Sequence, residues 1–373
     1  MEILSCENVA FKYNESTDYA ISDCTFSVKK GEKIMLCGAS GSGKSTLLRL
    51  LKRELSPRGE LSGNITLMGK DRSELSDRES AEKIGFVMQS PDSQTVCDKV
   101  SAELAFGLES FGVKSGEIQS RVGEMAAFFG IEPLYDRDIS TLSGGQKQLV
   151  ALCSVMATDP DILLLDEPTA QLDPVAAREL LGILDRLNKE MGVTIIIAEH
   201  DPEELFDSCD KILYLAKGKT EFFGTPALTA KHFVKNALEG FLPETAKVFA
   251  RLCDDLPLNV RQGRAKLEKL GVTDIPKQAV TDTERAEPYA LQCKNLWQRY
   301  EKNSPDILKG CDLGIRKGEC YGLLGSNGGG KSTLLRVICG LCKPYMGNVS
   351  LFGKKQKAYK NGSLFREMLA FLP

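Results

Sequence analysis

The sequence predicts an α/β fold in which a parallel sheet carries a phosphate-binding loop, followed by a second, partial copy of the same fold. Three observations predict it. A glycine-rich loop lies between an apolar strand pattern and a helical pattern, near-continuous apolar runs end in acidic residues or a histidine, and the loop recurs later in the chain. Apolar runs of this kind are typical of parallel strands buried on both faces.

The first glycine-rich loop fits the pattern G-x-x-x-x-G-K-[ST], between the apolar residues 34–37 and the helical pattern 47–51. In this context backbone N–H groups curl around phosphate oxygens, Lys44 reaches the β- and γ-phosphates, and the Ser45 hydroxyl binds Mg²⁺. The alternative is a turn rich in glycine and serine with a chance lysine. The loop consists of Gly38, Ala39, Ser40, Gly41, Ser42, Gly43, Lys44, Ser45 and Thr46.

The chain of 373 residues contains an internal repeat with a period of 287 residues, and it is long enough for two domains. We expect a first unit at 1–225, a helical connector and linker at 226–288, and the front part of a second unit at 289–373. Tyr13, Gly31 and Lys44 recur as Tyr300, Gly318 and Lys331. The second loop consists of Gly325, Ser326, Asn327, Gly328, Gly329, Gly330, Lys331, Ser332 and Thr333.

Composition limits the partners and the location of the chain. The formal charge of −3, from 48 basic and 51 acidic residues, gives no global attraction to nucleic acid. No apolar run approaches the roughly 18 residues of a membrane-spanning helix, and the first residues lack the features of a signal peptide. We therefore expect a cytosolic chain without nucleic acid as a partner. If it serves transport, the membrane part is another polypeptide.

Twelve cysteines are scattered through apolar segments. In a reducing cytosol they are expected to be small buried apolar residues. Cys339 and Cys342 form a C-x-x-C without a second pair or a nearby histidine, so no zinc site is expected.

The coarse secondary structure follows from the apolar patterns. Short strands are expected near residues 4–11 and 25–28, with Tyr13 in a polar loop. Residues 71–160 are expected to form mostly helices and connecting loops. Residues 226–288 show helical periodicity broken by prolines and end in a polar linker near 281–285.

Two apolar runs, residues 162–165 and 193–198, end in polar groups at the strand ends where α/β sheets bind ligands. Asp166 would hold Mg²⁺, and Glu167 would orient or deprotonate the water that attacks the γ-phosphate. His200 would contact the γ-phosphate. The alternatives are a charged strand end that leads into a turn and a histidine satisfied in the core.

The stretch Leu142–Gln146 precedes an apolar helical pattern. Ser143 and Gln146 have the spacing of a capping box, which any helix start could use. Gly144 and Gly145 each cost about 1 kcal/mol inside a helix. Their presence makes sense if backbone N–H groups at this position approach a phosphate closely.

Several single residues have a structural and a functional interpretation. Gln89 follows a strand pattern and is usually solvated there, but its amide oxygen could reach Mg²⁺ and the attacking water. Tyr13 and Tyr300 could stack on adenine, although each alone is more often an ordinary surface tyrosine. Asp173 before Pro174 predicts a helix start, which does not exclude a second role at an interface.

In their order along the chain, these motifs resemble the complete set of an ABC-type ATPase domain. The resemblance implies a P-loop NTPase fold with a mixed central sheet, an antiparallel β subdomain and a helical subdomain, and ATP and Mg²⁺ as cofactors. From Tyr300 to Thr333 the second unit resembles the front of another such domain. The set consists of Tyr13, Gly38–Thr46, Gln89, Leu142–Gln146, Ile162–Glu167, Asp173 and His200, matching the A-loop, Walker A, Q-loop, signature, Walker B, D-loop and H-loop.

Residues 89–94, 105–109 and 256–264 resemble more narrowly the ATPases of energy-coupling factor (ECF) importers for vitamins and metals. This implies a motor subunit that couples ATP hydrolysis to import of a small solute and pairs with a second ATPase domain or chain. It would bind integral membrane subunits at the cytoplasmic face of the cell membrane. Two alternatives remain open: a soluble tandem ABC ATPase that acts on ribosomes or nucleic acid, and a non-hydrolysing nucleotide-binding partner subunit.

The second unit departs from the family pattern, because the sequence stops at Pro373 before a Q-loop, signature, Walker B or H-loop. The family clamps ATP between one Walker A loop and the signature of the opposing domain, so neither site is expected to be complete within one chain. We expect hydrolysis only if two first units pair between chains or if the gene product is longer; an incomplete or interrupted reading frame is the simplest interpretation. Residues 289–373 are expected to be poorly protected alone.

Overall fold

The computed structural model describes residues 1–271, 288–302, 304–359 and 369–371. They belong to two compact units, Met1–Ile275 and Pro276–Pro373. The predicted linker near 281–285 lies outside the described residues. The helices expected in the connector are present within residues 226–271, where they belong to the first unit.

The first unit is built on a six-stranded sheet of β3 (Lys33–Cys37), β6 (Ile84–Val87), β7 (Ile162–Asp166), β8 (Thr194–Ala198), β9 (Lys211–Ala216) and β10 (Lys219–Gly224). The strand order is β10-β9-β3-β8-β7-β6. All strands run parallel except β10, which pairs antiparallel with β9 at the edge. The two apolar runs thus form parallel strands, β7 and β8, as predicted, and the structure places these strands next to each other.

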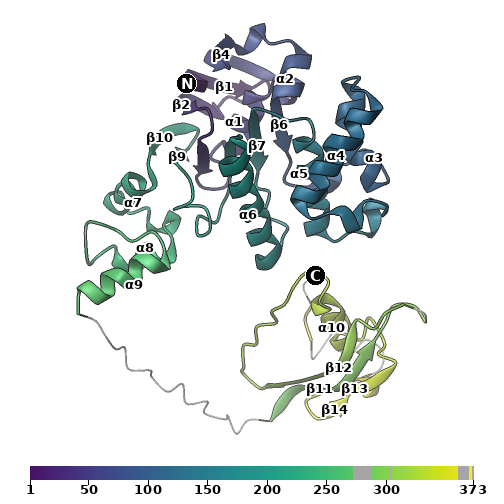
Figure 1. Ribbon diagram of the computed structural model, residues 1–373. Helices are drawn as coiled ribbons and strands as arrows, with labels where there is room; N and C mark the ends of the chain where they lie inside the picture. The colour runs from purple at the N-terminus through teal and green to yellow at the C-terminus, as the bar shows by residue number, and fades with distance from the viewer. Residues whose placement is uncertain (272–287, 303, 360–368, 372–373) are drawn as a thin grey trace. The chain divides into compact units, whose positions relative to one another are not determined.

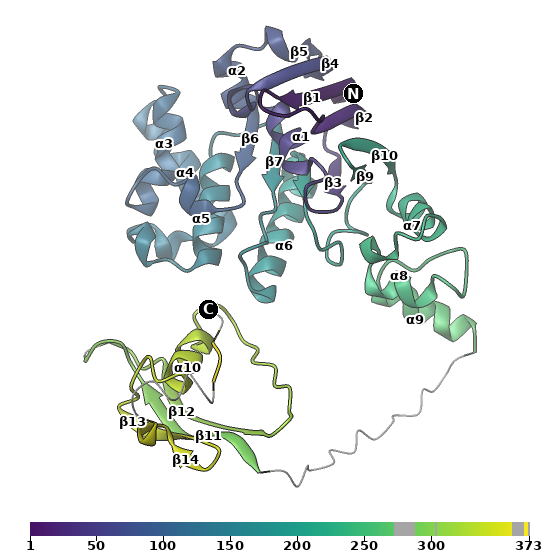
Figure 2. The same cartoon turned by 180° about the vertical axis from the view of Figure 1, so that it is seen from behind.

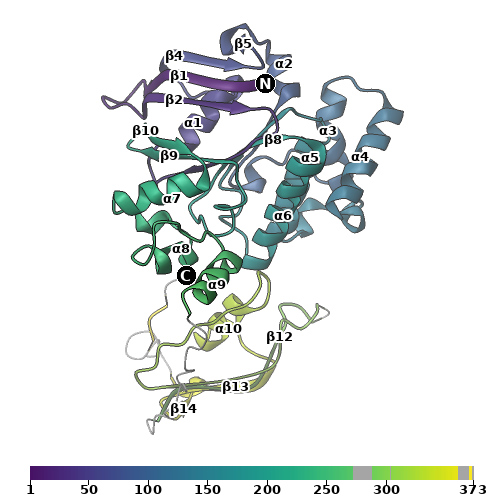
Figure 3. The same ribbon diagram turned by 60° about the vertical axis from the view of Figure 1, so that its left-hand side comes forward.

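An antiparallel sheet and one helix cover one face of this sheet. They comprise β1 (Glu2–Tyr13), β2 (Ile21–Lys29), β4 (Gly59–Leu67), β5 (Lys70–Asp71) and α1 (Lys44–Leu51). Helix α1 lies between the two sheets (Figure 3), and its leucines share one apolar core with both. The prediction that Tyr13 lies in a loop is wrong: β4 pairs with β1 as far as Gly59 opposite Tyr13, so the strand continues to this residue.

Helices cover the opposite face of the six-stranded sheet. They are α3 (Val100–Ser110), α4 (Ser115–Phe129), α5 (Gly144–Met156), α6 (Pro174–Met191) and α7 (Pro226–Lys235). Helices α3, α4 and α5 pack together beside the sheet (Figures 1 and 2), which agrees with the mostly helical character predicted for residues 71–160. The remaining helices are α2 (Asp77–Lys83), α8 (Glu244–Phe249) and α9 (Val260–Lys269).

The second unit repeats the antiparallel sheet and the helix. It contains β11 (Tyr289–Gln298), β12 (Leu308–Arg316), α10 (Lys331–Ile338), β13 (Met346–Leu351) and β14 (Lys354–Lys355). The strand order β12-β11-β13-β14 repeats β2-β1-β4-β5. Even local details recur, because Asn8 and Asn295 both have a positive φ, 50° and 47°, at the same place in their strands. The repeat inferred from the sequence is therefore a structural repeat.

The second unit differs from the first at the strand that leads into the loop. Strand β3 is fully buried, but its counterpart, residues 320–324, is not assigned as a strand, and Leu324 is 92% exposed. Strand β3 pairs with β8 and β9, and the described part of the second unit holds no strand in an equivalent position. For the same reason the expectation of buried cysteines is wrong for Cys320, which is exposed. Four further cysteines are half-buried: Cys97, Cys253, Cys311 and Cys342.

This difference makes the first glycine of each loop a matched pair for a stability test. Gly38 and Gly325 have nearly the same positive φ, 154° and 155°. A Cβ on Gly38 would lie 2.3 Å from the carbonyl oxygen of Leu215 in β9, whereas a Cβ on Gly325 would meet nothing within 4 Å. G38A therefore adds a steric clash to the backbone strain, and G325A adds the strain alone.

We expect G38A to reduce the free energy of unfolding of the first unit by about 3 kcal/mol, and G325A to cost its own unit about 1 kcal/mol. Hydrogen exchange of the strand amides in each unit, without nucleotide, measures both effects. Equal losses in the two units would contradict this steric explanation.

Candidate functional site

A cavity of about 450 Å³ opens where the parallel strands of the first unit end. It is lined by Tyr13, Ala20, Ser40, Gly41, Gly43, Lys44, Ser45, Thr46, Gln89, Glu167 and His200. The loop follows β3, and Gln89, Glu167 and His200 follow β6, β7 and β8. Because these strands are parallel, their carboxyl ends meet at one edge, which gathers side chains that are far apart in the sequence.

Lys44 is the first residue of α1 and is only 4% exposed. Its Nζ donates to the carbonyl oxygens of Gly38 and Ala39, at 2.8 and 3.3 Å. Burial lowers the pKa of this ammonium, against the opposite effect of nearby groups, with the Glu167 carboxylate first among them. A buried cation at the start of a helix, inside a glycine-rich loop, is placed to bind a polyanionic phosphate chain.

The hydroxyl of Ser45 lies beside the carboxylate of Asp166. Ser45 Oγ donates to Asp166 Oδ1 over 2.7 Å, and Asp166 is 5% exposed at the end of β7. Hydroxyl and carboxylate oxygens are ligands that Mg²⁺ prefers, alongside water and phosphate oxygens. The donor set thus fits the predicted magnesium site, with Gln89 as the third candidate ligand at the same cavity.

Glu167 contacts both of the other predicted catalytic residues. Its Oε1 lies 2.6 Å from Nε2 of His200, and its Oε2 accepts a hydrogen bond of 3.0 Å from Nε2 of Gln89. Its backbone has a φ of 48°, an uncommon conformation that is held in part by the hydrogen bond from Glu167 N to the carbonyl of Ala198. The side chain of His200 is 46% exposed, so the alternative of a core histidine is wrong.

Tyr13 stands at the rim of the same cavity. Its hydroxyl bonds to Thr46 Oγ1 over 2.8 Å, and its ring packs edge-on against Phe11. This contact fixes the ring beside the loop. Stacking on adenine stays a prediction.

The stretch Leu142–Gln146 does not line this cavity. Ser143 and Gln146 form the capping box that starts α5: Ser143 Oγ accepts from Gln146 N, and Gln146 Oε1 accepts from Ser143 N. A Cβ on Gly145 would lie 3.1 Å from the Cβ of Ala176, so close packing of α5 against α6 is a second reason for this glycine. Contact of Ser143–Gln146 with a phosphate stays a prediction.

Asp173 caps α6, as its position before Pro174 predicted. Its Oδ1 accepts hydrogen bonds of 3.0 Å from the backbone N–H groups of Val175 and Ala176. This confirms the structural interpretation of Asp173. The additional role at an interface stays a prediction.

The second loop has the same internal contacts as the first. Lys331 Nζ donates to the carbonyl oxygens of Gly325 and Ser326, and the Tyr300 hydroxyl lies 3.0 Å from Thr333 Oγ1. Most of this loop, Ser332 included, is exposed. The two loops are therefore alike in conformation and differ in how much protein surrounds them.

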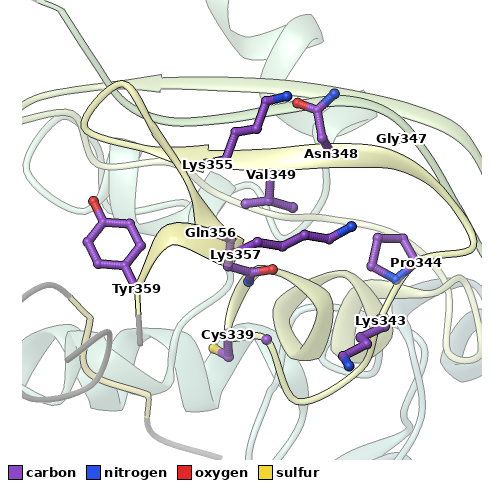
Figure 4. Close-up of a pocket in the computed structure, with 11 residues that line it drawn as sticks. Cys339, Lys343, Pro344, Gly347, Asn348, Val349, Lys355, Gln356, Lys357 and Tyr359 are labelled. Carbon is purple, nitrogen blue, oxygen red and sulfur yellow. The ribbon is translucent and has the colours of Figure 1, made fainter. Parts of the chain in front are cut away.

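A larger cavity, of about 660 Å³, lies between α10 and β13 of the second unit (Figure 4). It is lined by residues such as Cys339, Lys343 and Tyr359 and by no residue of either glycine-rich loop. The chemistry predicted from the sequence is concentrated in the smaller cavity, so we place the candidate site there.

Two residues of the site were missed by the sequence analysis. Thr169 and Glu199 form a part-buried contact, close in sequence to Glu167 and His200. Glu199 ends the same apolar run as His200, and this position was the available signal for it. No property of Thr169 in the sequence singled it out.

The family model that describes ABC transporters matches residues 21–170 and 308–373. The chain belongs to the ABC transporter family. The match includes the first loop and Asp166–Glu167 in one segment and the second loop in the other. The family expected from the order of the motifs is thereby confirmed.

Relatives of this ABC transporter family chain occur in bacteria and archaea. A protein of Bacillus thuringiensis subsp. konkukian, named as a candidate ABC transporter ATP-binding protein, is 40% identical over 349 residues, which are 93% of this chain and 63% of that protein. One of Methanosarcina mazei, named in the same way, is 34% identical over 385 residues, covering 97% of this chain and 64% of its own length. The chain thus spans less than two thirds of the length of these relatives.

Solved structures of the family share the fold. The cbiO1 protein of Clostridium perfringens, described as part of the ABC transporter complex cbiONQ, is 32% identical with a TM-score of 0.58, over 71% of this chain and 98% of that one. The ATP-binding cassette MJ0796, in a dimeric post-hydrolysis state with ADP and Pi, is 27% identical with a TM-score of 0.52, over 60% and 99%. Together with the mixed sheet, the antiparallel sheet and the helices, these likenesses confirm the predicted fold class.

Proposed function

We propose that this ABC family chain is the ATP-hydrolysing motor subunit of an ECF-type importer for a small solute such as a vitamin or a metal ion. One observation carries the hydrolytic part: Glu167 touches His200 and Gln89 in the same cavity that contains Lys44. The ECF-type part rests on the motif stretches and on the likeness to cbiO1, which belongs to the complex cbiONQ.

In this proposal each residue of the cavity has one task. Lys44 and the backbone N–H groups of Gly38–Thr46 bind the β- and γ-phosphates of ATP. Ser45, Asp166 and Gln89 hold Mg²⁺, which neutralises phosphate charge when bound. Glu167 orients the attacking water and accepts its proton. His200 contacts the γ-phosphate. The loop Gly325–Thr333, including Ser332 for Mg²⁺, binds a second ATP beneath Tyr300.

The signature stretch needs a second domain in order to act. Ser143, Gly144, Gly145 and Gln146 start α5 away from the cavity of their own unit. We propose that they contact the γ-phosphate bound by another ATPase domain, either a second copy of the first unit or a further domain. The dimeric state described for MJ0796 supports pairing as the working form.

The proposed location is the cytoplasmic face of the cell membrane, bound to integral membrane subunits. Among the described residues, no helix has the length and apolar character needed to cross a membrane. We propose that the solute pathway belongs to the partner subunits.

A groove near Gln89 is the proposed contact surface for such a subunit. It has a volume of about 530 Å³, and three aspartates line it, Asp92, Asp98 and Asp138, beside Lys147, which pairs with Asp92 at 2.5 Å. The groove is therefore acidic on balance and suits a partner segment with basic side chains.

The segment between Gln89 and this groove is attached to β6 through Gln94. The side chain of Gln94 accepts a hydrogen bond from Met88 N and donates one to Phe86 O. A movement of the residues that line the groove would therefore be transmitted to Gln89 through a short segment that these two hydrogen bonds hold in place.

Reversing charge in this groove is expected to release the chain from its membrane partner. The double change D98K/D138K, in cells that also express a candidate multi-span membrane subunit, should reduce the membrane-bound fraction about tenfold. E179K, the same kind of change on the exposed surface of α6, is the control and should stay bound. Sedimentation of the wild-type chain with ribosomes instead of membranes would contradict the transport proposal.

A further inference from the structure

Glu199 is a buried carboxylate that the proposed mechanism does not use. It follows β8, is 4% exposed, and does not line the cavity. Burial raises its pKa above the ordinary value, against the effect of the hydrogen bonds it accepts from Thr169 and from the backbone N–H of His200. A buried carboxylate needs such donors to be tolerated.

The donors to Glu199 come from the two segments that carry Glu167 and His200. Thr169, two residues after Glu167, donates to Glu199 Oε1 through its backbone N–H at 3.0 Å and through its hydroxyl at 2.7 Å. The backbone N–H of His200 donates to the same carboxylate. Glu199 therefore joins the segment after β7 to the segment after β8, close in sequence to Glu167 and His200.

The strand register alone does not set the separation of these two side chains. Strands β7 and β8 pair as far as Asp166 opposite Ala198, and one more backbone bond runs from Glu167 N to Ala198 O. Beyond that point, the two segments are joined by the 2.6 Å contact of Glu167 with His200 and by the bonds of Glu199 with Thr169. Glu199 itself is 4% exposed, whereas the side chain of His200 is 46% exposed.

We propose that Glu199 is a positioning residue, which through Thr169 and the backbone of His200 holds Glu167 and His200 at the separation that hydrolysis requires. It touches neither nucleotide nor attacking water and acts through its two neighbours. The kinetic part of this inference rests on the proposed ATP hydrolysis, but the geometric part does not.

The kinetic test uses the full chain with Mg²⁺ and ATP. E199A should lower kcat about 100-fold, because misplacement of a catalytic group by about 1 Å has effects of this size, while KM for ATP stays within about twofold. T169V should lower kcat in the same direction, and T169S, which keeps the hydroxyl, should restore it. N188A is the matched control, since Asn188 also joins two segments of this sheet, through bonds to Gly31 O and Val193 O, but at the opposite strand ends. It should leave kcat unchanged.

The geometric test needs no hydrolysis. The sequence has only two histidines, and a H232Q variant assigns the imidazole signals of His200 and His232 in the NMR spectrum. In the wild-type background, E167Q should shift the His200 signal, because the two side chains are in contact. In the E199A background, E167Q should shift the His200 signal by less than half of the wild-type shift. In the N188A background, E167Q should shift this signal as much as in the wild type.

The two tests separate this inference from the proposed function. A wild-type chain that hydrolyses no ATP under any pairing condition would overturn the proposed function, and the NMR comparison would still decide the positioning role. An unchanged E167Q shift in the E199A background, or an E199A variant with wild-type kcat, would overturn the role of Glu199. A large rise in KM with unchanged kcat would overturn it as well, since it would indicate a binding role.

Discussion

Replacing Glu167 with glutamine is expected to reduce ATP hydrolysis about 1,000-fold and to leave ATP binding intact. A positioned general base contributes about 10²- to 10⁴-fold to a hydrolysis rate, and an amide accepts no proton from water. Glutamine has nearly the same shape, so the contacts of this side chain with Gln89 and His200 can be kept in part. Phosphate release from ATP measures the rate, and binding of a fluorescent ATP analogue measures affinity.

The control for this experiment is E190Q, the same chemical change at an exposed residue of α6 that pairs with Arg186. It should hydrolyse ATP at the wild-type rate. If E167Q retained more than a tenth of the wild-type kcat, Glu167 would not be the base, and the proposed mechanism would be wrong.

Replacing Lys44 with alanine is expected to weaken ATP binding by the first unit about 100-fold. The change removes the ammonium that would bind the β- and γ-phosphates, a loss of about 3 kcal/mol for charge-assisted hydrogen bonds. It also leaves the carboxylates of Asp166, Glu167 and Glu199 without the cation whose field they share. Isothermal titration with ATP and Mg²⁺ measures the affinity.

The structural repeat supplies the matched control for Lys44. Lys331 has the same contacts with its own loop, but that loop is exposed and has no glutamate or histidine like Glu167 or His200 among its described neighbours. K331A should therefore remove one binding event and leave Glu167-dependent hydrolysis in place, whereas K44A should remove hydrolysis. Loss of hydrolysis in K331A with retention in K44A would reverse the assignment of the catalytic loop.

Much of the site could be predicted because its functional side chains follow the ends of strands. Four strands, β3, β6, β7 and β8, are short apolar runs, and each is followed within two residues by a motif residue such as Gln89, Glu167 or His200. Parallel pairing brings such ends together whatever the distance along the chain. The ordered set of motifs then identified the family, which the comparisons confirm.

Other features depend on pairing and packing that a single sequence does not reveal. Tyr13 belongs to a strand because β4, more than 40 residues later, extends the ladder to it. The contact between Glu199 and Thr169 requires the register of β7 with β8, and neither residue type is unusual at its position. Cys320 is exposed because the partners that bury β3 in the first unit have no equivalent in the described second unit.

The catalytic role of Glu167 and the pairing of two ATPase domains are tested together by the rate of ATP hydrolysis. This rate is measured for the full chain with Mg²⁺, over a range of protein concentrations, in parallel with E167Q. We predict hydrolysis that disappears in E167Q. Its rate per molecule should rise with protein concentration, because the signature Ser143–Gln146 must come from another domain to complete the site at Lys44. Fast, Glu167-dependent hydrolysis by a preparation that stays strictly monomeric would contradict the pairing. Equal rates for the wild type and E167Q would contradict the site itself.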